Sequence, residues 1–417
     1  MARAWLDAGL GRDYHRVWAA MAVSNLGDGM VELAALPLLA SAVTHDPSAV
    51  AAVVLAARLP WLLVGLFSGA LVDRFDRRRL MILTDLGRAL LLAGLAAAVA
   101  LGRAPLAMVY GVAFLIGVGS TVFDNGAFGI VPAMVPADRL PLATGRIVAS
   151  YRVNNNVAGP ALGGWTFGLA PVLPFAADSA SFLVSALLLR PIRSGRHVGS
   201  LEPFSAGRLL LDVGQGIAWV WRHRLLMGLA VAVGFLSLLY TATFSVFVLF
   251  ALEDLGVHGS GYGLVLASGA VGGLLGSLVA PWFSERLGTR SCLFCSVLVM
   301  ALAYLVLYAT SSPFVAGAML AANGLGVSLW DVVTLALRQS AVPQRLFGRV
   351  NAVYRLFAWG AMPLGAAAGG FLGRTAGLRA PFLVAGAACL AISLVLPLVV
   401  SRRRLESTMR RTEPGPA

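Results

Sequence analysis

The sequence predicts an all-α polytopic membrane protein, in which twelve transmembrane helices form two pseudo-symmetric six-helix bundles. Three observations predict this fold. First, 59% of the residues are hydrophobic and only 12% are charged, and only internally hydrogen-bonded helices hold so much apolar chain in lipid. Second, the apolar residues form runs of about 20, the length that spans a bilayer. Third, the second half of the chain repeats the plan of the first.

The repeat is visible in two blocks. Segment 145–152 reads GRIVASYR, and segment 348–355, which lies 203 residues later, reads GRVNAVYR. The preceding block at 117–136 shares two glycines, an aspartate and a proline with 324–343, at a separation of 207 residues. Repeats of this size in an apolar chain are typical of secondary transporters, whose substrate site lies between the repeats.

The apolar runs divide the chain into its expected parts. They begin near residues 17, 48, 80, 105, 141, 172, 224, 259, 291, 313, 346 and 378. The predicted organisation is a tail at 1–16, a six-helix bundle at 17–190, a linker at 191–223, a second bundle at 224–400 and a tail at 401–417. Within the linker, Leu209–Trp221 has the pattern of an amphipathic surface helix.

The connections between the runs alternate in charge. Arginine gathers in one set, for example at 73–79, 191–223 and 401–404, whereas the other set holds few basic residues. Cytoplasmic loops carry the excess of positive charge. We therefore expect a multi-pass protein of the cell membrane with both termini in the cytoplasm.

Composition excludes several other functions. The net charge of +13 is spread over short gaps between apolar runs, so no nucleic-acid partner is expected. The chain has no lysine, which excludes a Walker A loop and Schiff-base chemistry. Cys292 and Cys295 lie inside an apolar run without a second pair, and the five histidines fall outside the runs or at their ends. We expect no metal site and no cofactor.

The segment 69–79, GALVDRFDRRR, resembles the signature loop between the second and third helices of the major facilitator superfamily, except that Asp76 replaces the usual glycine. The resemblance implies a conformational latch at the cytoplasmic side. Its residues would be Gly69, Asp73, Arg74, Arg77 and Arg78. The alternative interpretation is ordinary positive-inside charge.

Segment 158–164, AGPALGG, resembles the antiporter motif of the same superfamily and supplies Gly159, Pro160, Gly163 and Gly164. The stretches 178–182 and 216–224 look like the drug:proton antiporter branch that includes macrolide efflux proteins and the enterobactin exporter. The family's buried arginine on the fourth helix is absent, and that run carries Asp124 instead. The glycines would permit close helix packing, either for the motif's function or as generic small-residue contacts.

Charged residues inside the runs are candidates for function or for structural pairing. Both repeats hold the same set, which favours bracing of helices by buried charge pairs. The set comprises Asp124, Arg152, Asp331 and Arg355. Asp178 lies near the start of the sixth run, where helix capping or packing is expected.

The first helix carries charges that the second repeat lacks. Asp28 and Glu32 are one turn apart and share a face. Arg58 on the second helix lies at the same depth as Glu32, roughly 21–23 Å from the cytoplasmic ends at 1.5 Å per residue. We predict a Glu32–Arg58 ion pair, which leaves Asp28 to titrate, and take all three as proton-coupling candidates.

Aromatic residues at helical spacing on the seventh helix, with one on the tenth, are candidates for a substrate cavity or for plain packing. They are Tyr240, Phe244, Phe247 and Trp330.

The sequence thus predicts a monomeric secondary exporter of hydrophobic or amphipathic small molecules, of the drug, macrolide or siderophore kind. It would work by alternating access, with protons as the coupling ion and lipid as its surroundings. A lipid or lysolipid flippase on the same scaffold is the alternative. A membrane-embedded enzyme or sensor is less favoured, because no nucleophile–base pair is visible.

Overall fold

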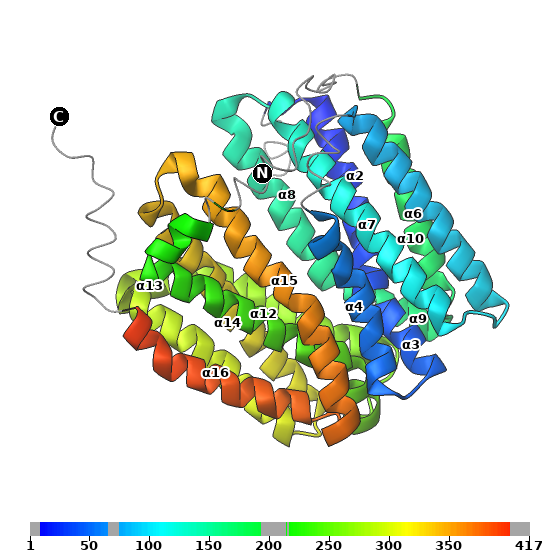
Figure 1. Ribbon diagram of the computed structural model, residues 1–417. Coiled ribbons are helices and arrows are strands. Elements are labelled where there is room, and N and C mark those ends of the chain that lie inside the picture. The colour runs from blue at the N-terminus through cyan, green and yellow to red at the C-terminus, as the bar shows by residue number, and fades with distance from the viewer. Residues whose placement is uncertain (1–8, 66–74, 193–213, 215–216, 401–417) are drawn as a thin grey trace. The chain divides into compact units, whose positions relative to one another are not determined.

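The computed structural model describes residues 9–65, 75–192, 214 and 217–400, and within these ranges the chain is helical and contains no β-strand (Figure 1). The first half holds α2 (Arg12–Met30), η1 (Val31–Ala35), α3 (Leu36–Val43), α4 (Pro47–Leu63), α6 (Arg77–Ala100), α7 (Leu106–Ile130), η2 (Val131–Ala133), η3 (Ala137–Arg139), α8 (Leu140–Val153), η4 (Asn154–Ala158), α9 (Gly159–Leu169) and α10 (Leu173–Leu189). The second half holds α12 (Arg224–Leu249), η5 (Phe250–Asp254), α13 (Ser260–Ala309), α14 (Pro313–Ala341), α15 (Gln344–Ala376) and α16 (Ala380–Val399).

These helices account for twelve membrane spans. Eight are long and apolar enough by themselves. One of the eight, α13, runs for 50 residues and breaks at Gly288, whose φ of 76° favours glycine, so it supplies two spans. The continuous α8–η4–α9 and the shorter apolar helices α4 and α10 supply the remaining three. The predicted all-α polytopic fold is confirmed.

Helix starts follow local chemistry. Asp76 is the N-cap of α6, and its side chain accepts a hydrogen bond from the Arg79 backbone N–H at 3.1 Å. Helix α14 begins with Pro313, a residue that suits the first helical turn because it lacks an N–H donor. The described helices include three π-helical turns. The turn η1 follows α2, η4 joins α8 to α9, and η5 follows α12.

The chain divides into two compact units. Unit 1 contains residues 1–45, 56–203 and 258–267, and unit 2 contains 46–55, 204–257 and 268–417. Each unit thus takes most of its residues from one repeat and a short segment from the other. The beginning of α4 belongs to unit 2, and the beginning of α13 belongs to unit 1.

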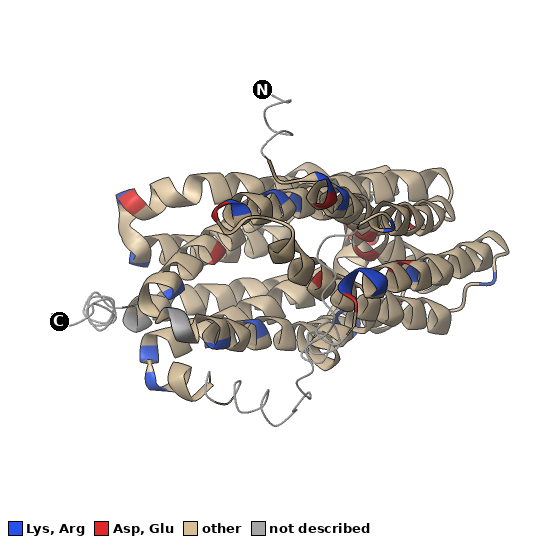
Figure 2. Ribbon diagram, turned by 90° about the horizontal axis from the view of Figure 1, so that it is seen from above, with Lys and Arg blue, Asp and Glu red and all other residues tan. Residues whose placement is uncertain are grey.

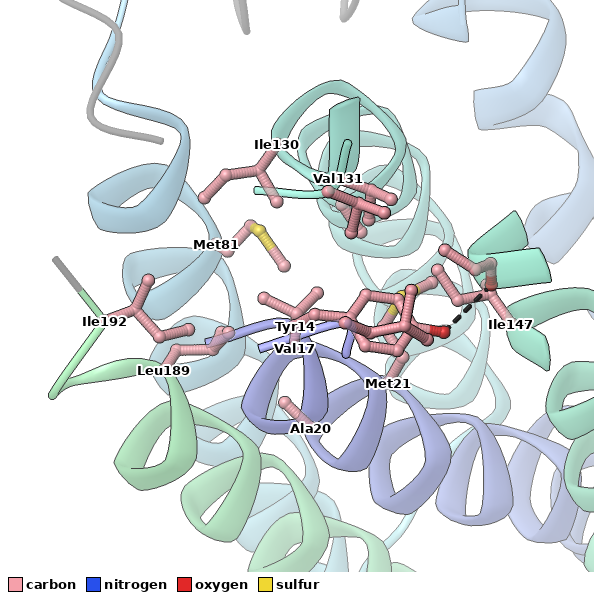
Figure 3. Packing of buried hydrophobic residues seen from close by; sticks show 14 of the residues in the cluster. Tyr14, Val17, Ala20, Met21, Met81, Ile130, Val131, Ile147, Leu189 and Ile192 are labelled. Carbon is pink, nitrogen blue, oxygen red and sulfur yellow. Dashed lines mark hydrogen bonds between the residues drawn. The ribbon is translucent and has the colours of Figure 1, made fainter. Parts of the chain in front are cut away.

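In unit 1, a hydrophobic cluster joins the first half of α2 to α6, α7, η2, α8 and α10 (Figure 3). Val17 and Met21 of α2 pack there with Met81 of α6 and Ile147 of α8. The Tyr14 hydroxyl donates a hydrogen bond to the Ala143 carbonyl at 2.9 Å, which satisfies the one polar group of that ring. The cluster fixes the beginning of α2, the helix that carries Asp28.

Unit 2 repeats the close helix contact of unit 1. On α15, Gly365 and Gly369 lie directly against the backbone of α12 at Leu238 and Ala242, where a Cβ atom would collide. In unit 1, glycines of α9 lie in the same way against α2 and η1. Small residues let membrane helices approach this closely. The internal repeat read from the sequence is therefore also a repeat of helix packing.

Candidate functional site

Charged residues are sparse along the helices (Figure 2), and four of those that the structure describes are buried in unit 1. The Arg88 side chain on α6 is 2% exposed. It forms an ion pair with Asp85, one turn earlier on the same helix, and a second ion pair with Asp28 of α2 at 3.4 Å. Asp85 is fully buried as well. A buried cation needs such partners, because an unpaired charge in the membrane interior is costly.

Hydroxyl groups and aromatic rings complete the surroundings of the guanidinium. It donates to Ser120 of α7 at 3.3 Å and to Ser24 of α2 at 3.4 Å. The Phe182 and Phe123 rings lie over it, with centroids 4.0 and 4.8 Å from the guanidinium carbon. Ring faces attract cations most strongly where water is excluded. Four helices of unit 1 therefore converge on this one cation.

A third carboxyl group belongs to the same cluster. Asp178 on α10 is fully buried, and one of its oxygens accepts a hydrogen bond from Ser181 at 2.8 Å. Its carboxyl rests against Gly27 of α2, where any Cβ atom would overlap it. We call Asp28, Asp85, Arg88 and Asp178 the Arg88 cluster. Capping or packing was expected for Asp178. Its sixth position within α10 places it inside the helix, where its side chain packs against α2.

Asp85 and Arg88 were not among the residues predicted from the sequence. Opposite charges three residues apart share a helix face, and inside an apolar run such a pair is a functional signal by default. The third apolar run carried this signal. As a result, Asp28 was expected to have no partner, whereas the structure pairs it with Arg88.

Glu32 and Arg58 lie near this cluster but do not form the predicted ion pair. Glu32 is in the π-helical turn η1, and both side chains are partly exposed. No Glu32–Arg58 distance within 4.0 Å occurs in the described part of the chain. Glu32 instead lies within electrostatic reach of both Arg58 and Arg88. Equal depth on neighbouring helices did not fix which side chains meet.

The latch residues Gly69, Asp73 and Arg74 lie outside the described residues. Arg77 and Arg78 are described, and both bond to helix ends within unit 1. Arg77 donates to the Gly129 carbonyl of α7 at 2.6 Å. Arg78 donates to the carbonyl of Leu189 at 3.0 Å and to that of Arg190, at the end of α10. Cations are favourable at the carbonyl ends of helices.

The antiporter-motif glycines form close helix contacts. A Cβ on Gly159 would lie 2.7 Å from Gly29 of α2, and one on Gly163 would collide with the Met30 backbone. Gly164 lies against Gly263 of α13, within unit 1, where a Cβ would come to 2.8 Å. Pro160 is the second residue of α9, which begins directly after the π-helical turn η4.

The four residues expected to form buried charge pairs are not buried. Asp124 and Arg152 are partly exposed, and no ion pair joins them within the residues that the structure describes. Asp331 and Arg355 are exposed, and the Arg355 guanidinium stacks over the Trp359 ring at 4.1 Å. Repeat symmetry identified equivalent positions on the fourth and tenth helices and on the fifth and eleventh. It gave no information on which helix face is turned to the core.

The aromatic candidates divide into two pairs. Phe247 and Trp330 are buried, and Phe247 packs against Phe250 and Phe382. In this conformation these two rings are core residues of unit 2. Tyr240 is 44% exposed and stacks on Phe244, with ring centroids 6.0 Å apart. Of the four candidates, only Tyr240 is exposed, and Phe244 is half-buried.

Among the described residues, no group of three or more histidine, cysteine, aspartate or glutamate side chains is arranged to hold a metal ion. The carboxyl groups of the Arg88 cluster surround a guanidinium instead.

A family model described as transmembrane secretion effector matches residues 10–414. Macrolide efflux protein A of Streptococcus pyogenes is 23% identical over 399 residues, which cover 94% of this chain and 97% of that protein. Multidrug efflux pump Tap of Mycolicibacterium fortuitum is 27% identical over 399 residues, covering 92% and 94%.

The fold also matches solved structures. A bacterial homologue of the iron transporter ferroportin, in an inward-facing state, superposes with a TM-score of 0.75 at 17% sequence identity. The match covers 94% of this chain and 99% of that one. At this level of identity the likeness shows the fold and carries no information on substrate.

Proposed function

Because the chain belongs to the transmembrane secretion effector family of the major facilitator superfamily, we propose that it exports hydrophobic or amphipathic small molecules in exchange for protons. The substrate class is that of drugs, macrolides or siderophore-like compounds. The macrolide efflux protein and the multidrug efflux pump that align over nearly the whole chain support this class. Export would proceed by alternating access in the plasma membrane, with both termini in the cytoplasm.

The observation that carries the proposal is the burial of Asp28 beside Arg88 in a membrane span. A carboxyl group at such a site is costly unless it serves a purpose or is fully paired. Asp28 has one oxygen in the ion pair with Arg88 and a second oxygen without a hydrogen-bond partner. Such a group can take up a proton and thereby loosen its ion pair. Glu32 and Arg58, close by, remain candidates for the same proton path.

The energy source favours the same mechanism. The chain has no lysine for a Walker A loop, so ATP hydrolysis by this chain is excluded. An ion gradient is then the available source of energy. The cluster around Arg88 suits protons, since it presents carboxyl groups around a guanidinium and no metal-binding arrangement occurs in the described residues.

Substrate contact is assigned to the Tyr240–Phe244 stack of unit 2. Exposed aromatic rings suit bulky apolar ligands, and the other two aromatic candidates are buried in this conformation. The conformational latch of the signature loop, with Asp73 as its acid, is part of the proposal. The test is whether the Asp73→Ala substitution changes the resting conformation of the transporter.

The test is transport into proteoliposomes under an imposed pH gradient, with a macrolide and a lipophilic cation as probes. We expect the wild-type protein to accumulate at least one probe against its gradient. The Asp28→Asn variant is expected to lose this accumulation because its amide cannot take up and release a proton. Asp138→Asn, at a carboxyl whose side chain is 78% exposed, is the matched control and is expected to behave like wild type.

Two results would overturn the proposal. Transport by the wild-type protein that does not depend on the pH gradient would overturn the proposed exchange for protons. Full gradient-driven accumulation by Asp28→Asn would overturn the assignment of proton coupling to Asp28. Glu32 would then be the remaining candidate on the first helix.

A further inference from the structure

The Arg88 cluster holds more carboxyl groups than its cation can neutralise. Asp28 comes from α2, Asp85 from α6 and Asp178 from α10, and they converge on the single guanidinium of Arg88. Each of these acids is at least nine-tenths buried. With all three carboxyl groups ionised, one guanidinium would leave two buried negative charges uncompensated, and a proton on one of the acids reduces this to one.

The ion pairs with Arg88 indicate which of the three aspartates holds that proton. Asp85 is tied to Arg88 by an ion pair within its own helix, and Asp28 holds Arg88 by one oxygen. Asp178 makes no ion pair within 4.0 Å in the described part of the chain. Its Oδ1 accepts from Ser181, and its buried Oδ2 has no hydrogen-bond partner. Each of the three aspartates has one buried oxygen without a hydrogen-bond partner, but among them only Asp178 also lacks an ion pair with Arg88, so a negative charge is least compensated there.

The position of Asp178 connects it with Asp28. Its carboxyl lies against Gly27, the residue that precedes Asp28 on α2, and the missing Cβ of Gly27 is what makes room for it. Phe182, one turn after Asp178 on α10, covers the face of the Arg88 guanidinium at 4.0 Å. Asp178 and Asp28 therefore approach the same cation from two helices.

We propose that Asp178 is a second proton-binding carboxyl of the transport cycle, which alternates with Asp28 as the partner of Arg88. In one state Asp178 holds the proton and Asp28 holds Arg88, as the structure shows for the ion pair. In the other state Asp28 takes up a proton at the oxygen that leaves Arg88, and Asp178 releases its proton from Oδ2 and accepts the guanidinium. Arg88 stays protonated, so the charge of the cluster is unchanged.

The groups that face Asp178 are consistent with this exchange. They are Asp28 of α2, Glu32 of η1, and Asp85 and Arg88 of α6. The segment of α9 that packs on α10 contains no titratable side chain. Arg88 is thus the cation of this group, and a carboxylate at Asp178 has no other positive partner among these neighbours. The inference rests on the proposed proton-coupled function.

The first test is infrared difference spectroscopy of the reconstituted full-length protein between H2O and D2O at neutral pH, because deuteration shifts the carbonyl stretch of a protonated carboxyl group. We expect wild type to show the carbonyl stretch of a protonated carboxyl in the neutral state. Asp178→Asn is expected to lose that band, and the exposed control Asp138→Asn is expected to keep it. The absence of any protonated-carboxyl band from wild type would overturn the proposal whether or not Asp178→Asn folds.

The second test separates proton coupling from substrate binding. In proteoliposomes, we expect Asp178→Asn to keep counterflow of the macrolide or lipophilic-cation probe, which needs no net proton movement, and to lose accumulation driven by the pH gradient. Gradient-driven accumulation at the wild-type level in this variant would overturn the role of Asp178 and leave the proposed function intact. Wild type that shows counterflow without any response to the gradient would instead overturn the proposed function.

Discussion

At the scale of single residues, two arginines of unit 1, Arg88 and Arg58, differ in their burial and in their ion pairs. Arg88 is fully buried and forms ion pairs with two aspartates. Arg58 is partly exposed and forms no ion pair within 4.0 Å in the described part of the chain, although it lies within reach of Glu32. The two therefore contribute differently to stability.

We expect Arg88→Gln to destabilise the protein by about 3–5 kcal/mol, because it leaves two buried carboxylates without their cation. Arg58→Gln is expected to cost about 0–1 kcal/mol, as for a weakly coupled charge. Thermal melting of the purified proteins in detergent measures the difference. The double variant Asp85→Asn/Arg88→Gln is expected to recover part of the loss.

A loss for Arg58→Gln as large as that for Arg88→Gln would contradict this assignment. It would show that Arg58 carries a buried partner in the membrane. A double variant whose loss equals the sum of the two single losses would show that Asp85 and Arg88 are not coupled.

Residue pairing is where prediction from sequence reached its limit. Spacing predicted that Asp28 and Glu32 share one helix face, and the matching stretch 234–250 of the second repeat carries no charge. Their partners were not found, because helical periodicity gives the face of one helix and not the helix that it meets. The ion pair of Asp28 with Arg88 depends on the packing of α2 against α6 and α10.

At the scale of helices, the sequence predicted the positions of the membrane spans better than it predicted which residues pair. The predicted starts of the spans lie within five residues of the observed ones, as in α4 at Pro47 and α14 at Pro313. Membrane spans are predictable because every backbone polar group must be satisfied within the helix. The π-helical turns η1 and η4 were not predicted, since an extra residue in a helical turn leaves no mark on hydropathy. Both lie where α2 meets the glycine motif, and such turns often occur at functional sites.

The glycine motif permits a test on a single membrane span. Gly163 and Gly145 lie in the same continuous span, α8–η4–α9. A Cβ on Gly163 would collide with the backbone of Met30, whereas a Cβ on Gly145 would meet no atom within 4 Å. We expect Gly163→Ala to cost about 1–3 kcal/mol through overpacking. Gly145→Ala is expected to be neutral or to stabilise by up to about 1 kcal/mol, because alanine favours the helix.

Melting temperatures of the two alanine variants in the same detergent check this prediction. Equal shifts for the two would mean that α2 and α9 can separate at no cost, and that the close contact at Gly163 does not hold the helices together.

At the scale of the whole molecule, the repeat predicted two bundles, and the structure adds an exchange of segments between them. Unit 1 is completed by residues 258–267 of the second repeat. There Tyr262 is 1% exposed, and its hydroxyl donates to the Leu33 carbonyl at 3.5 Å. Hydropathy sets the length of a span but not the unit against which its end packs. The sequence therefore could not predict this exchange.

Unit 2 is completed in the corresponding way by residues 46–55 of the first repeat. The Ser48 hydroxyl donates to the Gly370 carbonyl at 3.1 Å, and Asp46 lies 3.9 Å from Arg374. A Cβ on Gly370 would come within 2.7 Å of Ala51. Each repeat expressed alone would thus lack a segment that fills its own bundle.

This arrangement predicts the behaviour of a chain that is cut in the linker at 200. We expect residues 1–200 and 201–417, each expressed alone, to be degraded in the cell, because each unit lacks the segment that the other repeat supplies. Co-expression is expected to restore both halves to the membrane, together with probe export, since every contact within the two units can then form. The measurements are the amount of each half by immunoblot and the accumulation of the probe in intact cells, with the uncut chain as control. A single half that accumulates alone and melts at the temperature of the uncut protein would show that the exchanged segments add nothing to the stability of the units.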